Sequence, residues 1–229
     1  MQTVIDSFDE RKQEIEEYYL ALEELYTSKN EPNNDEKYLD DTFLKMLKSN
    51  AILMIYNLVE STIMSAILKI YDSFIQQELT YNMVRKEIQD IWFSYKFNQV
   101  YDKNAHFNSY RGKAKEIIDF VLENKILELD RKATDISGNL DAQKIRNICN
   151  DHGIIIHLDP QCRGGDILKE VKEERNNLAH GTVSFVECGR NYSIDDLKKI
   201  KNETECFLEN ILVGMKKYYE NQLYLKIHS

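Results

Sequence analysis

Residues 49–68 read SNAILMIYNLVESTIMSAIL and carry a single charged side chain, Glu60. Apolar residues cover nearly every face of a helix drawn through this stretch, which predicts a helix at the centre of a soluble bundle. The length also suits a membrane span. A carboxylate near mid-span, with several Asn, Ser and Thr residues, is costly in lipid. We therefore predict a buried core helix from about residue 42 to 77, and no membrane partner.

The composition of the whole chain agrees with a helical bundle. Its 229 residues include only 2 prolines and 8 glycines, which favours long helices and argues against a turn-dense β sandwich. A 42% hydrophobic and 30% charged content excludes collagen-like and wholly disordered classes. We predict one all-α domain over residues 1–229, with an acidic N-terminal helix and loop over 1–37 and the bundle over 38–229.

Charge limits the kinds of partner that the main surface can bind. The formal net charge of −9 excludes a strongly basic nucleic-acid coat. Two short basic clusters could still contact RNA phosphates, although a solvated helix face is the commoner explanation for each. These clusters are Arg111, Lys113 and Lys115, and Lys198, Lys199 and Lys201.

The cysteines predict a reducing compartment. Cys149, Cys162, Cys188 and Cys206 are spread without close pairing, and the first residues contain acids rather than an apolar leader segment. We expect reduced thiols and a cytoplasmic location. The run Cys149, His152, His157 and Cys162 has zinc-type ligands. It lacks paired CxxC knuckles, so packing and loop roles are the preferred interpretation, and no metal or cofactor is expected.

The remaining elements follow from apolar periodicity and capping residues. Helices are predicted over 4–27, from Thr80 through about 95, over about 108–123, 142–150 and 166–180, and from Ser193 to about 224. In the helix over 108–123, Ile117, Ile118, Val121 and Leu122 are expected to point inward. Residues 182–193, TVSFVECGRNYS, predict a small hairpin that turns at 189–191. The predicted fold is thus an all-α bundle with one irregular or hairpin insert.

The segment Arg175-Asn176-Asn177-Leu178-Ala179-His180 breaks local rules, because consecutive asparagines lower helix propensity. Asn176 and His180 are four residues apart and share a helix face. An arginine can hold a phosphodiester, a histidine can transfer the proton of a 2′-hydroxyl, and a carboxamide can orient either group. This combination suits RNA cleavage. The plain alternative is a helix C-terminus capped by His180 and Asn177 and ended by Gly181.

Arginine, four intervening residues and histidine, with a polar residue directly after the arginine, resembles the motif of the HEPN superfamily. Three further segments resemble its bacterial stand-alone nuclease branch, found beside defence and toxin–antitoxin genes. They are IYNLVEST (55–62), SGNLDAQKIRNI (137–148) and EERNNLAHG with the SF, GR and DL pairs after it (173–197). The resemblance covers roughly residues 45–215.

The resemblance implies a metal-independent endoribonuclease in which two protomers form one composite site. Arg175 would stabilise the phosphate, His180 would do acid–base work, and Asn176 would hold them in place. The expected partners are an RNA substrate, a second copy of the chain, and a cognate antitoxin or defence-system protein. Thr182 departs from the tyrosine that many antitoxin-paired relatives carry, which puts regulation through that tyrosine in doubt.

Two other functions remain open from the sequence. One is a non-catalytic HEPN module that binds RNA, nucleotide or a partner protein, and the other is a structural helical adaptor. Glu60 is expected either to pair with an arginine, with Arg175 as a candidate, or to lie exposed on one helix edge.

Overall fold

The computed structural model describes residues 1–29, 41–98, 107–134, 136 and 138–226. Most of the loop predicted at the end of residues 1–37 lies outside these ranges, and residues 28–29 continue the first helix. Within them the chain forms helices joined by turns, and its β contacts are the isolated bridges Thr80–Ile126 and Val84–Leu225. The α-helices are α1 (Gln2–Lys29), α2 (Asp41–Gln76), α3 (Lys86–Asn98), α4 (Phe107–Leu122), α5 (Ala142–His152), α6 (Ile167–Ala179), α7 (Phe185–Arg190) and α8 (Ile194–Glu220).

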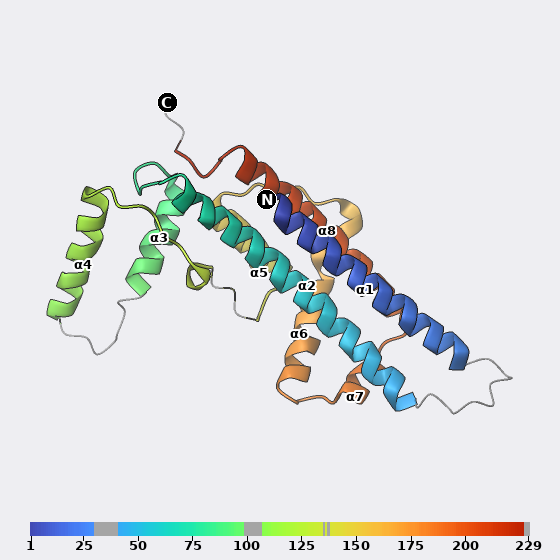
Figure 1. Ribbon diagram of the computed structural model, residues 1–229. Coiled ribbons are helices and arrows are strands. Elements are labelled where there is room, and N and C mark those ends of the chain that lie inside the picture. The colour runs from blue at the N-terminus through green and yellow to red at the C-terminus, as the bar shows by residue number, and fades with distance from the viewer. Residues whose placement is uncertain (30–40, 99–106, 135, 137, 227–229) are drawn as a thin grey trace.

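The central helix α2 matches its predicted bounds to within one residue. It packs against α1, α6, α7 and α8. In Figure 1, α1 and α8 run along it, while α6 and α7 lie beside its N-terminal half. By length and composition alone α2 could cross a bilayer, but 56% of its most apolar window is buried inside the bundle. It is therefore built as the core helix of a soluble protein.

The outer helices α1 and α8 bury one stripe each, as their periodicity predicts. Ile15, Tyr19 and Leu22 of α1 are buried, and the Tyr19 hydroxyl donates a hydrogen bond to the Leu197 carbonyl of α8 at 3.2 Å. A capping box at Ser193 begins α8, as predicted. The helix ends at Glu220, before the predicted residue 224, and the chain then turns.

The predicted hairpin is wrong, because the segment after α6 forms the short helix α7. Ser184 and Glu187 make a reciprocal capping box that supplies partners for the first backbone N–H groups. Gly189 then allows close contact with α2, since a Cβ there would stand 1.9 Å from the Lys45 carbonyl oxygen. The Ser49 hydroxyl of α2 donates to the Phe185 carbonyl at 2.5 Å. Tertiary packing on α2 thus stabilises a helix that is too short to be stable alone.

Helices α3 and α4 stand together at one end of the molecule (Figure 1). The prediction that Thr80 begins the third helix is wrong, since Thr80 lies in a bridge and α3 begins at Lys86. The inward orientation predicted for Ile118 and Leu122 is also wrong, because these side chains are 55% and 73% exposed. Helix α4 packs mainly through its other face, where Phe120 contacts Trp92 of α3.

The expectation of reduced thiols is corrected at one pair, because Cys162 and Cys206 form a disulfide with Cα atoms 5.4 Å apart. The two cysteines are 44 residues apart in the sequence, so no local spacing pattern indicated that they pair. The 3-10 helix over Pro160–Gly165 carries Cys162 onto α8. Cys149 and Cys188 are free and buried, and burial raises the pKa of the Cys149 thiol to about 12.

The zinc-type run does not converge in the structure. Both ring nitrogens of buried His152 are engaged, with the Tyr71 hydroxyl at 2.8 Å and the Ile148 carbonyl at 2.7 Å. Cys162 is committed to the disulfide and His157 is exposed. The preferred interpretation of these residues as packing and loop residues therefore agrees with their surroundings.

Candidate functional site

Helix α6 carries the motif and is anchored to the core by one apolar stripe. Leu168, Val171 and Leu178 are buried. Asp166 precedes the helix, and its side chain makes no capping hydrogen bond with the described residues. The helix ends at Ala179, and Gly181 follows with a left-handed φ of +69°. The anchored stripe fixes the direction in which the polar residues of the motif point.

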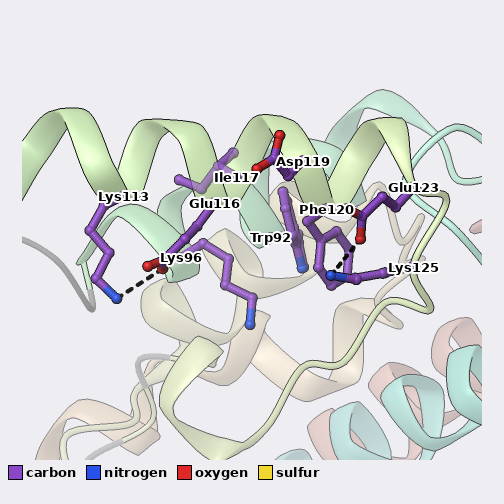
Figure 2. A pocket seen from close by; sticks show the side chains of 9 residues that line it. All are labelled: Trp92, Lys96, Lys113, Glu116, Ile117, Asp119, Phe120, Glu123 and Lys125. Carbon is purple, nitrogen blue, oxygen red and sulfur yellow. Dashed lines mark hydrogen bonds and ion pairs between the residues drawn. The ribbon is translucent and has the colours of Figure 1, made fainter.

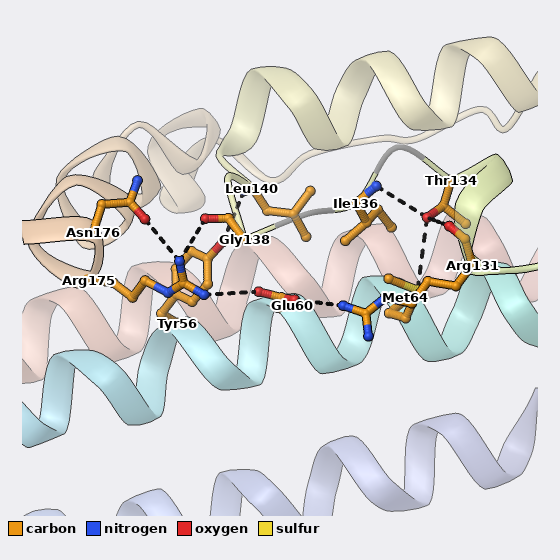
Figure 3. Close-up of polar contacts among 10 residues, drawn as sticks. All are labelled: Tyr56, Glu60, Met64, Arg131, Thr134, Ile136, Gly138, Leu140, Arg175 and Asn176. Carbon is orange, nitrogen blue, oxygen red and sulfur yellow. Dashed lines mark hydrogen bonds and ion pairs between the residues drawn. The ribbon is translucent and has the colours of Figure 1, made fainter. Parts of the chain in front are cut away.

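Arg175 is half-buried and held by several groups. Its Nη1 donates hydrogen bonds to the Gly138 carbonyl at 3.1 Å and to Asn176 Oδ1 at 3.0 Å. The guanidinium carbon lies 4.6 Å from the ring centroid of Tyr56, which is a cation–π distance. Its Nη2 is 3.8 Å from a carboxylate oxygen of Glu60. Figure 3 shows these groups around one guanidinium.

The sequence left open whether Glu60 pairs with an arginine or lies exposed on a helix edge. Its side chain is only 22% exposed and pairs with two arginines. One is Arg175, and the other is Arg131, whose Nη2 donates to the second carboxylate oxygen at 3.4 Å. Arg131 is 65% exposed, so solvent weakens that pair. Glu60 thus acts mainly as a counter-ion that fixes the Arg175 side chain.

The turn at Gly138 approaches the guanidinium closely. Gly138 has a φ of +65°, and a Cβ there would stand 2.9 Å from Arg175 Nη1. The next contact is at Leu140, whose backbone N–H donates to the Tyr56 hydroxyl at 3.1 Å. Burial raises the pKa of the Tyr56 phenol, so its ring stays neutral beside the cation. The turn at Gly138 and the Tyr56 ring therefore both pack against the Arg175 guanidinium.

The three segments that carry the family resemblance therefore meet at one place. Tyr56 and Glu60 come from 55–62, Gly138 and Leu140 from 137–148, and Arg175 from 173–197. A salt bridge of 2.5 Å joins Asp141, the N-cap residue of α5 in the second segment, to Lys172 of α6, the residue directly before the third segment. These segments are distant in sequence, so their convergence on Arg175 marks this position as the candidate site.

His180 stands apart from this cluster. It is the C-cap residue of α6, and its backbone N–H donates to the Asn176 carbonyl at 3.0 Å. Its imidazole is exposed, and none of the described residues forms a hydrogen bond or ion pair with that ring. The structure thus brings Arg175 and Asn176 into direct contact and leaves the His180 ring open to solvent at the helix end.

Sequence reasoning found Arg175, Asn176 and Glu60 but missed three groups that position the arginine. Tyr56 could have been found, because it lies one helical turn before Glu60 on the same face. Gly138 and Arg131 offered no comparable signal, since their roles depend on where the chain after α4 passes over α2. Each of the three contacts Arg175 or its counter-ion Glu60.

Three of the six residues in the predicted basic clusters form ion pairs with described residues. Lys113 forms an ion pair at 3.0 Å with Glu116 on the same helix, α4. Lys198 and Lys201 form ion pairs with Glu23 and Glu16 of α1. These pairs favour the solvated-face interpretation over a dedicated phosphate-binding surface.

An all-α bundle, a motif helix packed on a long central helix, and an arginine–asparagine pair on the helix that ends at a histidine are the features of a HEPN-superfamily domain. The chain belongs to the HEPN family described as HEPN_MAE_28990-like HEPN, whose model matches residues 1–224. Neither the curated proteins nor the solved structures contain a match to the chain. The family match covers α1 as well as the bundle, and it supports at most a nuclease or RNA-related role.

Proposed function

We propose that this HEPN domain is a metal-independent endoribonuclease that cleaves RNA by transesterification. The observation that carries the proposal is the guanidinium of Arg175, oriented by Asn176, Glu60 and Gly138 on a helix that ends in an exposed imidazole. A rigidly held cation can stabilise the charge that develops on a phosphodiester, and an imidazole that is open to solvent can transfer a proton.

Arg175 keeps hydrogen-bonding capacity for a phosphate. A guanidinium has five N–H donors, and the two hydrogen bonds formed with described residues both use Nη1. The Nε and Nη2 edge therefore remains available, although Glu60 competes for it at 3.8 Å. A bidentate phosphate contact along this edge would replace part of that ion pair.

The proposed reaction uses the substrate's own nucleophile. The ribose 2′-oxygen attacks the adjacent phosphorus, and the bond from phosphorus to the 5′-oxygen breaks. The products are a 2′,3′-cyclic phosphate and a 5′-hydroxyl. One His180 takes the proton of the 2′-hydroxyl, and a second gives a proton to the leaving oxygen. This division of labour is why we also propose a homodimer with a composite site.

The biological setting that we propose is a cytoplasmic toxin or effector of a bacterial defence or toxin–antitoxin system. In that setting a cognate partner protein would restrain the nuclease. The support is the likeness of the three converging segments to the stand-alone HEPN nucleases of such loci.

A second candidate is a non-catalytic HEPN module that binds RNA, nucleotide or a protein. The observation that favours it is the internal engagement of Arg175 by Glu60 and Tyr56, together with the separation of the His180 ring from that cluster. Turnover distinguishes the two candidates, because a binding module retains ligand without cleaving it.

The test is cleavage of a panel of single-stranded and loop RNAs in excess EDTA by wild type, His180→Ala and His157→Ala. His157 is a matched control, because it is also exposed and lies outside the candidate site. We expect wild type and His157→Ala to cleave alike and His180→Ala to lose about 100-fold or more in rate, as for removal of a general acid–base group. Equal cleavage by all three proteins would reject His180, and no cleavage by any would favour the binding module.

A further inference from the structure

The indole nitrogen of Trp92, Nε1, is a buried hydrogen-bond donor that is unpaired among the described residues. Trp92 is fully buried between α3 and α4. Its Nε1 has less than 1 Å² of exposed surface and no hydrogen-bond partner among the described residues. Buried N–H donors are nearly always paired, because an unpaired donor loses its hydrogen bonds to water without replacement. A buried donor at this place without a partner among the described residues points to an acceptor on a bound ligand.

Trp92 lines a pocket of about 370 Å³ between the two helices. Phe120 forms its aromatic wall, with ring centroids 4.7 Å from those of Trp92. Figure 2 shows the indole nitrogen on the side of α4 where the Lys96 and Lys125 ammonium groups lie. The full lining is Trp92, Lys96, Lys113, Glu116, Ile117, Asp119, Phe120, Glu123 and Lys125. This volume is within the range of small-ligand sites.

Among the described residues, the lysines that line the pocket differ in whether they form an ion pair. Lys113 pairs with Glu116 at 3.0 Å, and Lys125 pairs with Glu123 at 2.7 Å. The Lys96 ammonium has no carboxylate within ion-pair distance among the described residues. Instead it lies 5.4 Å and 5.8 Å from the ring centroids of Tyr95 and Phe120. Asp119 is turned to the opposite side of α4 in Figure 2.

We propose that this pocket binds a nucleoside monophosphate unit, with its base against Phe120 and Trp92 and its phosphate on Lys96. A nucleobase supplies both a flat ring for the aromatic wall and a carbonyl or ring-nitrogen acceptor for the Trp92 N–H. The phosphate supplies a negative charge that pairs with the Lys96 ammonium, which forms no ion pair with the described residues. Because the indole nitrogen is closed off, side chains at the pocket mouth move as the base enters.

This site is separate from the Arg175 cluster and goes beyond the proposed nuclease activity. Its lining comes from α3, α4 and the turn after α4, whereas the Arg175 cluster lies on α2, α6 and the turn at Gly138. The nucleotide can come from two sources, a free mononucleotide or one residue of an RNA strand. Both present the same base and phosphate to the pocket.

The test uses the intrinsic fluorescence of Trp92, the only tryptophan in the chain. The His180→Ala protein is titrated with AMP, GMP, CMP and UMP, with the matching nucleosides, and with inorganic phosphate, and binding is confirmed by calorimetry. We expect at least one mononucleotide to change the fluorescence and to bind about 10-fold or more tightly than its nucleoside or phosphate alone. No binding by any mononucleotide, or equal binding by inorganic phosphate, overturns the proposal.

Lys96→Ala and Lys113→Ala form a matched pair, since both lysines line the pocket and only Lys113 is already ion-paired. We expect Lys96→Ala to weaken mononucleotide binding by about 10-fold and to leave nucleoside binding unchanged. Lys113→Ala should change neither by more than about two-fold. Equal losses in the two variants overturn the assignment of Lys96.

Competition by a 2′-O-methyl oligonucleotide, which the proposed reaction cannot cleave, identifies the source of the nucleotide. Tighter binding of the oligonucleotide assigns the pocket to an RNA residue, and binding of mononucleotides alone assigns it to a free metabolite. Both outcomes require a measured mononucleotide affinity and so support the site. Neither the mononucleotide titrations nor the oligonucleotide competition requires RNA cleavage. The measured affinities therefore stay valid if the nuclease proposal fails.

Discussion

Gly138→Ala should disturb the candidate site in a way that the structure makes quantitative. The position has a φ of +65°, so an alanine there costs about 1.5 kcal/mol of backbone strain. Its Cβ would also stand 2.9 Å from Arg175 Nη1 and displace the guanidinium. Loss of the hydrogen bond from Arg175 to the Gly138 carbonyl costs about 1.5 kcal/mol, taken at the low end for a charged donor that is partly exposed.

The total cost of Gly138→Ala in the wild-type background is therefore about 3 kcal/mol of unfolding free energy. In an Arg175→Ala background only the strain remains, at about 1.5 kcal/mol. The coupling of about 1.5 kcal/mol is measured by a double-mutant cycle in urea, followed by the helical circular dichroism signal. It corresponds to roughly ten-fold in the folding equilibrium.

Gly181→Ala is the matched control for backbone strain. Gly181 has a similar φ of +69°, but apart from its two chain neighbours no described residue has an atom within 4 Å of the Cβ that alanine would add. It should cost about 1.5 kcal/mol in either background, with no coupling to Arg175. If Gly138→Ala costs the same with and without the Arg175 side chain, the reasoning that this turn positions the guanidinium is refuted.

Three further predictions concern the bundle. Burial lowers the pKa of His152 below its ordinary value of 6.5, so the unfolded chain binds a proton that the native state does not. The free energy of unfolding should therefore fall as pH drops through 6.5, by up to about 1.4 kcal/mol per pH unit. A His152→Gln variant, followed by urea unfolding between pH 5 and 8, should show a flatter pH profile, and a profile identical to wild type would contradict the role of His152. Reduction of the Cys162–Cys206 bond, which closes 44 residues, should lower stability by about 4 kcal/mol; a reductant that leaves the urea midpoint unchanged would show that the bond does not contribute. Gly189→Ala should separate α7 from the Lys45 carbonyl and cost about 3 kcal/mol in the same assay, and a cost under about 0.5 kcal/mol would show that the two helices are not in close contact.

The sequence predicts the fold well where one local pattern acts alone. The core helix is found because an almost unbroken apolar run has no other stable place in a soluble chain. The last helix is found at Ser193 because its capping box precedes a long amphipathic stripe. The box at Ser184 is overlooked because alternating apolar and polar residues around it resemble a strand, and α7 is stabilised by close contact of Gly189 with α2.

Features that depend on distant segments are predicted less completely. The ion pair between Glu60 and Arg175 is predicted because a charge in an apolar helix requires a partner. The Cys162–Cys206 pairing is missed, because no sequence pattern shows that the turn before α6 lies on α8. The position of Gly138 under the guanidinium is missed for the same reason. Catalytic roles for Arg175, Asn176 and His180 stay predictions until turnover is measured.

The most direct test of the central claim is the rate of RNA cleavage in excess EDTA for two substrates that differ only at the scissile nucleotide. One carries the 2′-hydroxyl and the other a 2′-O-methyl group. We expect wild type to cleave only the first substrate and to leave a 2′,3′-cyclic phosphate, and we expect His180→Ala to lose this activity. Cleavage of the methylated substrate, or undiminished cleavage by His180→Ala, would contradict it.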